Sequence, residues 1–366
     1  MHPKKSGADA ERSKKGAELG TAGPSGTIAG VFPSMPQDDA WDADASREIA
    51  RSGAGRPPAG FYGAVPDDEE RPPGGEPDDA DEEELDEEIQ VVPVRRQLSL
   101  AIAGFAGLLG LGLALGAQTS APDNRLPYAI VLLGVQLLYL LAWIMALHPP
   151  AAGATAAVCA VVALLADYFA VTKEPPSLFP LILVGLGGFV AALAGQLFRA
   201  EDRARVTDSW RTTLVIVLGV VAYAIPVLLT RQPVGTQTII VCVAGAGVAL
   251  LVARVTDAIF PKPRIALQVP RGATGVVLGA MFGTLASAWL GSVLVLPFTP
   301  TKGAVLGLTA AVIANLVDLA VNFGEAGRRL AGDAPTFWVA RHMQGPLGAF
   351  ALTAPAAYAL AHWYVS

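Results

Sequence analysis

The chain has 366 residues, of which 52% are hydrophobic and only 16% are charged, and its mean hydropathy is +0.46. This composition excludes an ordinary soluble globular domain and is typical of a polytopic membrane protein. The charge is segregated, because 22 of the 32 acidic residues precede Gln97. The net charge of −6 therefore describes the N-terminal part, and the remainder is mildly cationic. We expect membrane lipids as partners and no nucleic acid.

Residues 1–94 are predicted to form a disordered, acidic cytoplasmic tail. They are rich in Gly, Pro, Ala and Ser and lack sustained periodicity, so they cannot bury enough apolar surface to offset chain entropy. Between Asp67 and Glu88 lie 14 acidic residues and one arginine, which repel one another and favour an extended chain. We expect that removing the tail leaves the membrane domain folded. Its basic cluster near Lys4 and its isolated aromatic residues are candidate docking motifs for an unidentified partner.

From Leu98 onward the hydropathy repeats in blocks of about 20 residues, the length at which an α-helix crosses a hydrocarbon core of about 30 Å. The predicted fold class is therefore all-α, with a membrane domain over 95–366 that contains about nine transmembrane helices. The seventh block is long enough that we expect it to tilt or break near its end. The predicted spans are 98–117, 127–147, 151–171, 178–198, 212–230, 238–255, 275–298, 304–323 and 346–365.

Successive connections between the predicted spans differ in how many lysine and arginine residues they carry, and this difference predicts the orientation of the chain in the membrane. With the N-terminus inside, the inner segments hold 13 of these residues and the outer loops hold four, namely Arg125, Lys173, Arg231 and Lys302. Cytoplasmic loops of membrane proteins carry such an excess. We therefore predict a plasma-membrane protein with a cytoplasmic N-terminus and an external C-terminus.

Small residues recur every four positions in the seventh span, a pattern that lets another helix backbone approach closely. The partner could be a helix of the same chain or a second subunit, so a homodimer is one of the expectations. The stripe consists of Gly275, Gly279, Gly283, Ser287 and Gly291.

The eighth span and the segment after it carry the main candidate site. A carboxylate and two amides within an apolar span are costly, and this cost favours a functional site. The alternative is that these residues have no role in a site. Asp318 would then be a hydrogen-bonded residue at a helix contact, and the basic residues would only reflect the positive-inside rule. The polar face comprises Asn315, Asp318, Asn322 and Glu325, and the following segment, predicted to be a loop, carries Arg328, Arg329, Arg341 and His342.

A second charged segment follows the sixth span. Asp257 comes directly after that span and is therefore expected nearer to water than Asp318, and Lys262, Arg264 and Arg271 follow. A carboxylate can hold a divalent cation, and guanidinium groups bind phosphate in a bidentate manner. Together the two segments would suit a phosphorylated lipid or a nucleotide.

Four segments between about residues 210 and 358 follow the order of a known set of motifs. They are T-D-A-I-F at 256–260, V-P-R-G-A-T-G at 269–275, N-L-V-D-L at 315–319 with R-R-L-A-G at 328–332, and H-M-Q-G-P at 342–346. This order resembles the phosphatidate cytidylyltransferases, which make CDP-diacylglycerol from CTP and phosphatidic acid. In that family the last segment reads P-G-H-G-G-x-x-D-R-x-D-S, and both of its aspartates are absent here.

The resemblance implies a Mg²⁺-dependent transfer in which the metal bridges the phosphates of CTP. It implies Asp318 and His342 as catalytic residues, Asp318 and Asp257 as metal ligands, and a ligand-binding set comprising Arg271, Arg328, Arg329, Arg341, Asn315 and Asn322. Because half of the family's carboxylates are missing, the metal site is expected to be degenerate and the activity weak or absent.

Two functions of different classes follow from these observations. One is a divergent CTP-dependent nucleotidyltransferase that acts on a lipid phosphate. The other is a non-catalytic membrane scaffold that binds an anionic lipid or a protein. A transporter is a weaker third reading, because neither inverted repeats nor paired broken helices are evident. The first two readings differ in whether other carboxylates reach Asp318 within metal-bridging distance.

Overall fold

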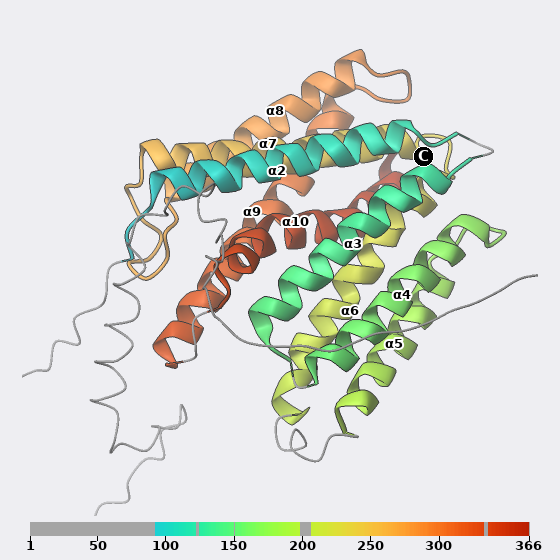
Figure 1. The fold of residues 1–366 in the computed structure, drawn as a ribbon. Helices are drawn as coiled ribbons and strands as arrows, with labels where there is room; N and C mark the ends of the chain where they lie inside the picture. Colours follow the sequence, from blue (N-terminus) through green and yellow to red (C-terminus); the bar gives the residue numbers. More distant parts are fainter. Residues whose placement is uncertain (1–91, 122–123, 150, 198–205, 333–335, 366) are drawn as a thin grey trace, which may run out of the picture. The chain divides into compact units, whose positions relative to one another are not determined.

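The computed structural model describes residues 92–121, 124–149, 151–197, 206–332 and 336–365, and these contain long helices and no β-strand. The chain divides into two units, 1–82 and 83–366, and all described residues belong to the second. The predicted tail lies outside them, except for residues 92–94. The prediction of an all-α, polytopic membrane protein is confirmed. The helices in Figure 1 are α2 (Arg96–Gln118), α3 (Leu126–Leu147), α4 (Ala152–Thr172), α5 (Phe179–Leu197), α6 (Val206–Leu229), α7 (Gly235–Ile259), α8 (Ala273–Val293), α9 (Pro300–Leu330) and α10 (Trp338–Leu360), which continues into a π-helical turn, η2 (Ala361–Val365).

Eight of these helices, α2 to α9, are long and apolar enough to cross a membrane. The ninth, α10, corresponds to the last predicted span but is not among the eight. Its residues from Gln344 to Ala351 are all buried, and it packs against α2, α3, α6, α7 and α9. A helix packed among other membrane helices carries small and polar residues at its contacts, so its lower hydropathy agrees with its many neighbours.

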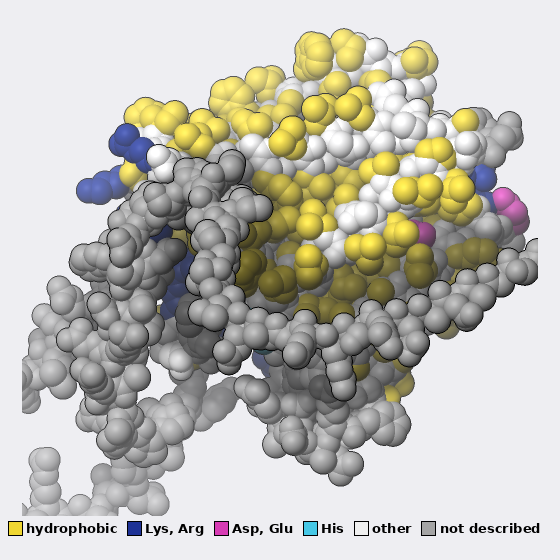
Figure 2. Space-filling view, viewed as in Figure 1, with side chains coloured by type: hydrophobic (Ala, Val, Ile, Leu, Met, Phe, Trp, Pro, Cys, Tyr) yellow, Lys and Arg dark blue, Asp and Glu magenta, His cyan; other side chains and the backbone are white. Residues whose placement is uncertain are grey.

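The outward surface of these helices is strongly apolar. Large hydrophobic side chains are more than half exposed, including Leu108 on α2, Ile182 on α5 and Trp289 on α8. Figure 2 shows a broad hydrophobic face, with lysine and arginine gathered mainly at the end where α2 begins and α7 ends. Soluble monomers rarely expose an apolar area of this extent, and a surface facing lipid is expected to do so.

Several helices extend beyond the predicted apolar spans. α7 continues to Ile259, α9 continues to Leu330, and α10 begins at Trp338 rather than at residue 346. α8, in contrast, ends at Val293, so the long seventh span does break near its end, before the cis peptide bond that precedes Pro297. Hydropathy falls where charged residues begin, whereas the backbone hydrogen bonds of a helix continue past that point.

These longer helices change where the polar residues lie. Asp257 is in the last turn of α7 rather than after it, and Arg341 and His342 are in the first turns of α10. The prediction of a basic loop was therefore wrong for all four of its members, which lie in α9 and α10. Arg328 and Arg329 occupy the last turn of α9, where cations interact favourably with the helix dipole.

The small-residue stripe of α8 packs within the chain. A Cβ atom at Gly279 would lie 2.5 Å from the carbonyl oxygen of Ala249 on α7, and one at Gly283 would overlap the carbonyl oxygen of Gly245. On the other side, Gly291 approaches Gly303 of α9. Of the two partners considered for this stripe, the structure shows helices of the same chain, and a homodimer stays a prediction that rests on no observed contact.

The start of α2 and the end of α7 lie side by side, because Ser99 Oγ donates a 2.7 Å hydrogen bond to the carbonyl oxygen of Arg254. At the opposite end, Lys302 Nζ at the start of α9 lies 3.2 Å from the carbonyl oxygen of Val365. The end of α9 and the start of α10 therefore lie at the same end of the helices as Ser99 and Arg254, and this end carries the candidate site.

Candidate functional site

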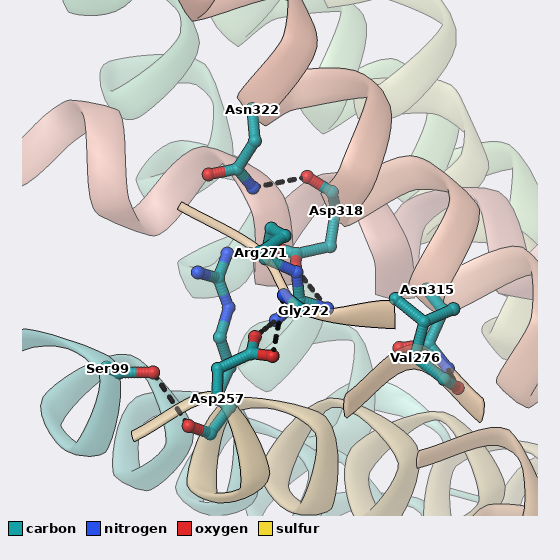
Figure 3. Close-up of polar contacts among 9 residues, drawn as sticks. Ser99, Asp257, Arg271, Gly272, Val276, Asn315, Asp318 and Asn322 are labelled. Atoms are coloured by element: carbon teal, nitrogen blue, oxygen red, sulfur yellow. Dashed lines mark hydrogen bonds and ion pairs between the residues drawn. The ribbon is translucent and has the colours of Figure 1, made fainter. Parts of the chain in front are cut away.

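Four buried charged side chains form a compact group that we call the charge quartet: Arg254, Asp257, Arg271 and Asp318. Arg254 Nη2 lies 2.5 Å from Asp318 Oδ1. Arg271 contacts both carboxylates, with Nη1 2.6 Å from Asp257 Oδ2 and Nη2 3.1 Å from Asp318 Oδ2. Figure 3 shows Arg271 between the two acids. One guanidinium therefore bridges α7 and α9.

Local structure fixes the position of Arg271. The segment after α7 folds back on itself, with Arg264 and Gly272 paired in an isolated bridge. The Gly272 amide then donates a 3.0 Å hydrogen bond to Asp257 Oδ1. A Cβ atom at Gly275 would overlap that same carboxylate oxygen. Glycine is therefore required where α8 begins, because the helix backbone passes directly over the acid.

The quartet is electrically balanced and closed to solvent. Its members are between 0% and 6% exposed, and Arg271 and Asp318 are fully buried. Burial and the neighbouring Arg254 lower the pKa of the Arg271 guanidinium, while Asp318 and Asp257 raise it. Two positive and two negative charges compensate one another, which is the condition under which ion pairs persist in a low-dielectric interior.

The two predicted metal ligands, Asp318 and Asp257, do meet, but they meet around a guanidinium. Among the residues that the structure describes, no group of three or more His, Cys, Asp or Glu side chains could hold a metal ion. Asp257 was expected nearer to water than Asp318, and the two acids are 1% and 0% exposed, so both are buried. A divalent cation that bound both acids would have to displace Arg271.

The amides predicted to assist Asp318 point elsewhere. Asn315 Nδ2 donates to the carbonyl oxygen of Val276 on α8 at 3.4 Å, and Asn322 Nδ2 donates to the backbone carbonyl of Asp318 at 2.6 Å. Both contacts appear in Figure 3. Neither amide forms a hydrogen bond with the Asp318 carboxylate, so the structure does not assemble the predicted set of one acid and two amides.

A second group, which we call the arginine cluster, consists of Arg328, Arg329 and Arg341 around Glu325. Arg328 Nη2 lies 2.5 Å from Glu325, and the Nε atoms of Arg329 and Arg341 lie 3.4 Å and 3.5 Å from it. The Thr336 hydroxyl donates to the same carboxylate at 3.2 Å. Three cations surround one anion, so this cluster carries a surplus of positive charge.

The arginine cluster differs from the quartet in exposure. The side chains of Arg328, Arg329 and Arg341 are 26%, 37% and 24% exposed, whereas that of Glu325 is 8% exposed. The carboxylate therefore anchors the three guanidinium groups from beneath. Their remaining N–H donors are free to meet an anion at the surface.

The first turns of α10 join the two groups. His342 is half-buried, its ring contacts Trp338 edge to face at 5.4 Å between centroids, and its charged neighbours include Arg254 of the quartet and Glu325 and Arg329 of the arginine cluster. One turn later, a Cβ atom at Gly345 would overlap Asp318 Oδ1. α10 therefore closes the quartet on one side and contributes Arg341 to the arginine cluster.

Arg254 was not among the site residues predicted from the sequence. The signal was present, since Arg254 lies one helical turn before Asp257 in an otherwise apolar helix. The positive-inside rule offered a sufficient reason for its charge, so its pairing was not considered. Lys262 is exposed, and Arg264 instead donates to the carbonyl oxygen of Val92 at 2.7 Å.

Comparisons of this chain with family models, with curated proteins and with solved structures find no match.

Proposed function

We propose that this protein binds a phosphorylated, anionic lipid headgroup at the arginine cluster and does not carry out efficient cytidylyl transfer. The observation that carries the proposal is the meeting of three partly exposed guanidinium groups on one buried carboxylate at the ends of α9 and α10. Guanidinium groups bind phosphate oxygens through paired N–H donors, which gives both strength and orientation.

The position of the arginine cluster along the helices supports a lipid as the source of the phosphate. Leu330 is 75% exposed at the end of α9, and Phe337 and Trp338 are more than half exposed at the start of α10. Exposed tryptophan beside arginine is typical of the level of lipid headgroups. A phosphate at this level would lie within reach of the cluster while its acyl chains remain among the apolar helices.

The quartet supports the non-catalytic part of the proposal. The family chemistry uses Mg²⁺ to neutralise the phosphates of CTP and the leaving pyrophosphate. Here Asp257 and Asp318 are already neutralised by Arg254 and Arg271. Arg271 is fully buried and stays protonated at any physiological pH, so its displacement by a metal would leave a charged group without a counter-ion.

The binding test uses full-length protein in detergent and a fluorescent phosphatidic acid as the probe. The triple variant Arg328→Ala/Arg329→Ala/Arg341→Ala should bind the probe at least about tenfold more weakly, since about 1.4 kcal/mol corresponds to a factor of ten. Arg211→Ala provides the matched control, because Arg211 is an exposed arginine whose cation–π partner is Trp210. Equal binding by the triple variant, or equal binding of phosphatidylcholine by the wild type, contradicts the proposal.

A divergent phosphatidate cytidylyltransferase is the second candidate. The observation that favours it is that Asp257 reaches the same guanidinium as Asp318, so two carboxylates are close to one another. The four segments that carry the resemblance also supply part of both groups, namely Asp257, Arg271 and Asp318 of the quartet and Arg328 and Arg329 of the arginine cluster. In this reading, Mg²⁺ would bind Asp318 and Asp257, and His342 would orient CTP or phosphatidic acid. The test is CTP- and Mg²⁺-dependent conversion of phosphatidic acid in lipid, with Asp318→Asn as control, and robust turnover by the wild type favours the enzyme.

We further propose that the site faces the cytoplasm of a plasma-membrane protein whose C-terminus is external. The support is the 13 to 4 bias of lysine and arginine in the connections. Reporter fusions at Lys302 and at Ser366 should both report the external compartment. A cytoplasmic signal from Ser366 would remove α10 from the set of spanning helices and overturn this orientation of the C-terminus.

A further inference from the structure

A third acidic group lies far from the quartet, in the part of the chain formed by α3 to α6. Asp167 on α4 is 7% exposed. Its Oδ1 accepts a 3.1 Å hydrogen bond from Gln136 Nε2 on α3, and the same nitrogen donates to the carbonyl oxygen of Val220 on α6 at 3.2 Å. Gln136 is fully buried. The carboxyl group is therefore held between three helices by a neutral amide.

Asp167 has none of the compensation that the quartet provides. Within the described part of the chain, no cationic side chain forms an ion pair with it. Two buried oxygens of this pair, Asp167 Oδ2 and Gln136 Oε1, have no hydrogen-bond partner there. The amide orientation is fixed, because turning Gln136 over would place its oxygen against the Val220 carbonyl. An ionised carboxylate in these surroundings would be costly.

The titratable and charged groups on the surrounding helices do not supply a counter-charge. α3 contributes Tyr128 and Tyr139, and described α6 side chains contribute Arg211 and Tyr223. α5 contributes no titratable side chain, while α4 itself adds Cys159 and Tyr168. Tyr139 donates to Val215, and Tyr223 donates to Leu347. Arg231, which follows α6, binds the carbonyl oxygens of Ala170 and Lys173 at the end of α4 and the carboxylate of Glu174.

We infer that Asp167 is a membrane-embedded proton-binding site that holds its proton at neutral pH. Protonation removes the buried negative charge. It also turns Asp167 Oδ2 from an acceptor without a partner among the described residues into an O–H donor. Asp167 can then donate to Gln136 Oε1 while it accepts from Gln136 Nε2. This site is independent of the arginine cluster and of the function proposed for it.

Infrared difference spectroscopy of the full-length protein in lipid bilayers at pH 7 tests this inference, because a neutral carboxyl group and a carboxylate absorb at different frequencies. The spectrum of the wild type minus Asp167→Asn should contain the C=O band of a neutral carboxyl group. Asp318→Asn is the matched control, since Asp318 is also buried but has two guanidinium partners. Its difference spectrum should contain lost carboxylate bands and no band of a neutral carboxyl group. Loss of only carboxylate bands on Asp167→Asn would overturn the inference.

A second variant keeps the test decisive if Asp167→Asn fails to fold. Gln136→Met removes the hydrogen bond to Asp167 Oδ1 and preserves much of the side-chain volume. The neutral carboxyl band should remain and should shift to higher frequency, because its C=O group loses a donor. An absent band, or a band that disappears when sodium replaces choline in the buffer, would show that the site is ionised or holds a metal cation instead.

Discussion

The charge quartet and the arginine cluster are both built from guanidinium and carboxylate groups, but they differ in charge balance and in exposure to solvent. In the quartet, two guanidinium groups and two carboxylates are buried and balanced, so every charge has a counter-charge within the group. In the arginine cluster, three guanidinium groups share one carboxylate and remain partly exposed. The comparison indicates that charge surplus and solvent access, rather than the number of conspicuous polar residues, distinguish the surface proposed to bind an anion from the buried quartet.

The largest effect should come from unbalancing the quartet. Asp318→Ala leaves Arg254 and part of Arg271 without an acid, and loss of one partner of a buried ion pair typically costs about 3–5 kcal/mol. We expect a correspondingly large fall in the midpoint of unfolding in detergent. The double variant Asp318→Asn/Arg254→Met should recover part of the loss, because it leaves Arg271 and Asp257 as a balanced pair. A double variant less stable than Asp318→Asn alone would contradict the charge-balance account.

A second prediction concerns the contact that closes the quartet. Gly345→Ala places a methyl group against Asp318 Oδ1 and should destabilise the protein by about 1–3 kcal/mol, as overpacking of a filled interior does. Gly324→Ala on α9 is the control, since nothing lies within 4 Å of its Cβ position. That change should stabilise the helix by about 0.5–1 kcal/mol. Thermal unfolding of the two variants should therefore shift in opposite directions.

A third prediction concerns the segment that carries Arg271. Val92 accepts a hydrogen bond from Arg264 and donates one to the Leu267 carbonyl at 3.1 Å. A chain that begins at residue 92 should unfold at nearly the same temperature as the full chain, whereas one that begins at residue 95 should lose about 1 kcal/mol for each bond. Equal midpoints for the two truncations would mean that these contacts contribute nothing.

The smallest effect on stability should come from the arginine cluster. Arg329→Ala should change the free energy of unfolding by less than about 1 kcal/mol, because ion pairs of exposed side chains contribute little. Binding of phosphatidic acid should weaken in this variant and, in the wild type, at high ionic strength. A loss of stability as large as that of Asp318→Ala would show that Arg329 has a structural role, and it would contradict the difference drawn between the quartet and the arginine cluster.

Hydropathy was sufficient to predict the fold class and the approximate position of every long helix from α2 to α10. It could not predict the helix ends at Ile259, Leu330 and Trp338, because charged residues end an apolar block without ending the backbone hydrogen bonds. Those extra turns carry Asp257, Arg328 and Arg341. The segments singled out in the sequence therefore do contain the residues of the two charged groups, but their local backbone was assigned wrongly.

The partners of the site residues were beyond the reach of the sequence. Asp318 and Arg254 are separated by many residues and meet only because α7 and α9 pack together, and the small-residue stripe predicted close packing without naming the helix it meets. Asp167 was overlooked for a simpler reason. A single acid in a span of about 20 apolar residues barely changes its average hydropathy, so only the contact with Gln136 draws attention to it.

Three separate segments contribute to the quartet, so its charges emerge from the ribosome at different times. Arg254 and Arg271 are synthesised before Asp318, so both guanidinium groups precede the acid that joins them. An acid near the middle of a helix entering the bilayer costs about 2.5–3.5 kcal/mol on insertion scales. The release of α9 from the translocon into the bilayer is favoured if α7 and α8 are already in the bilayer next to the translocon. The order of synthesis thus supplies the counter-ions before the charge that needs them.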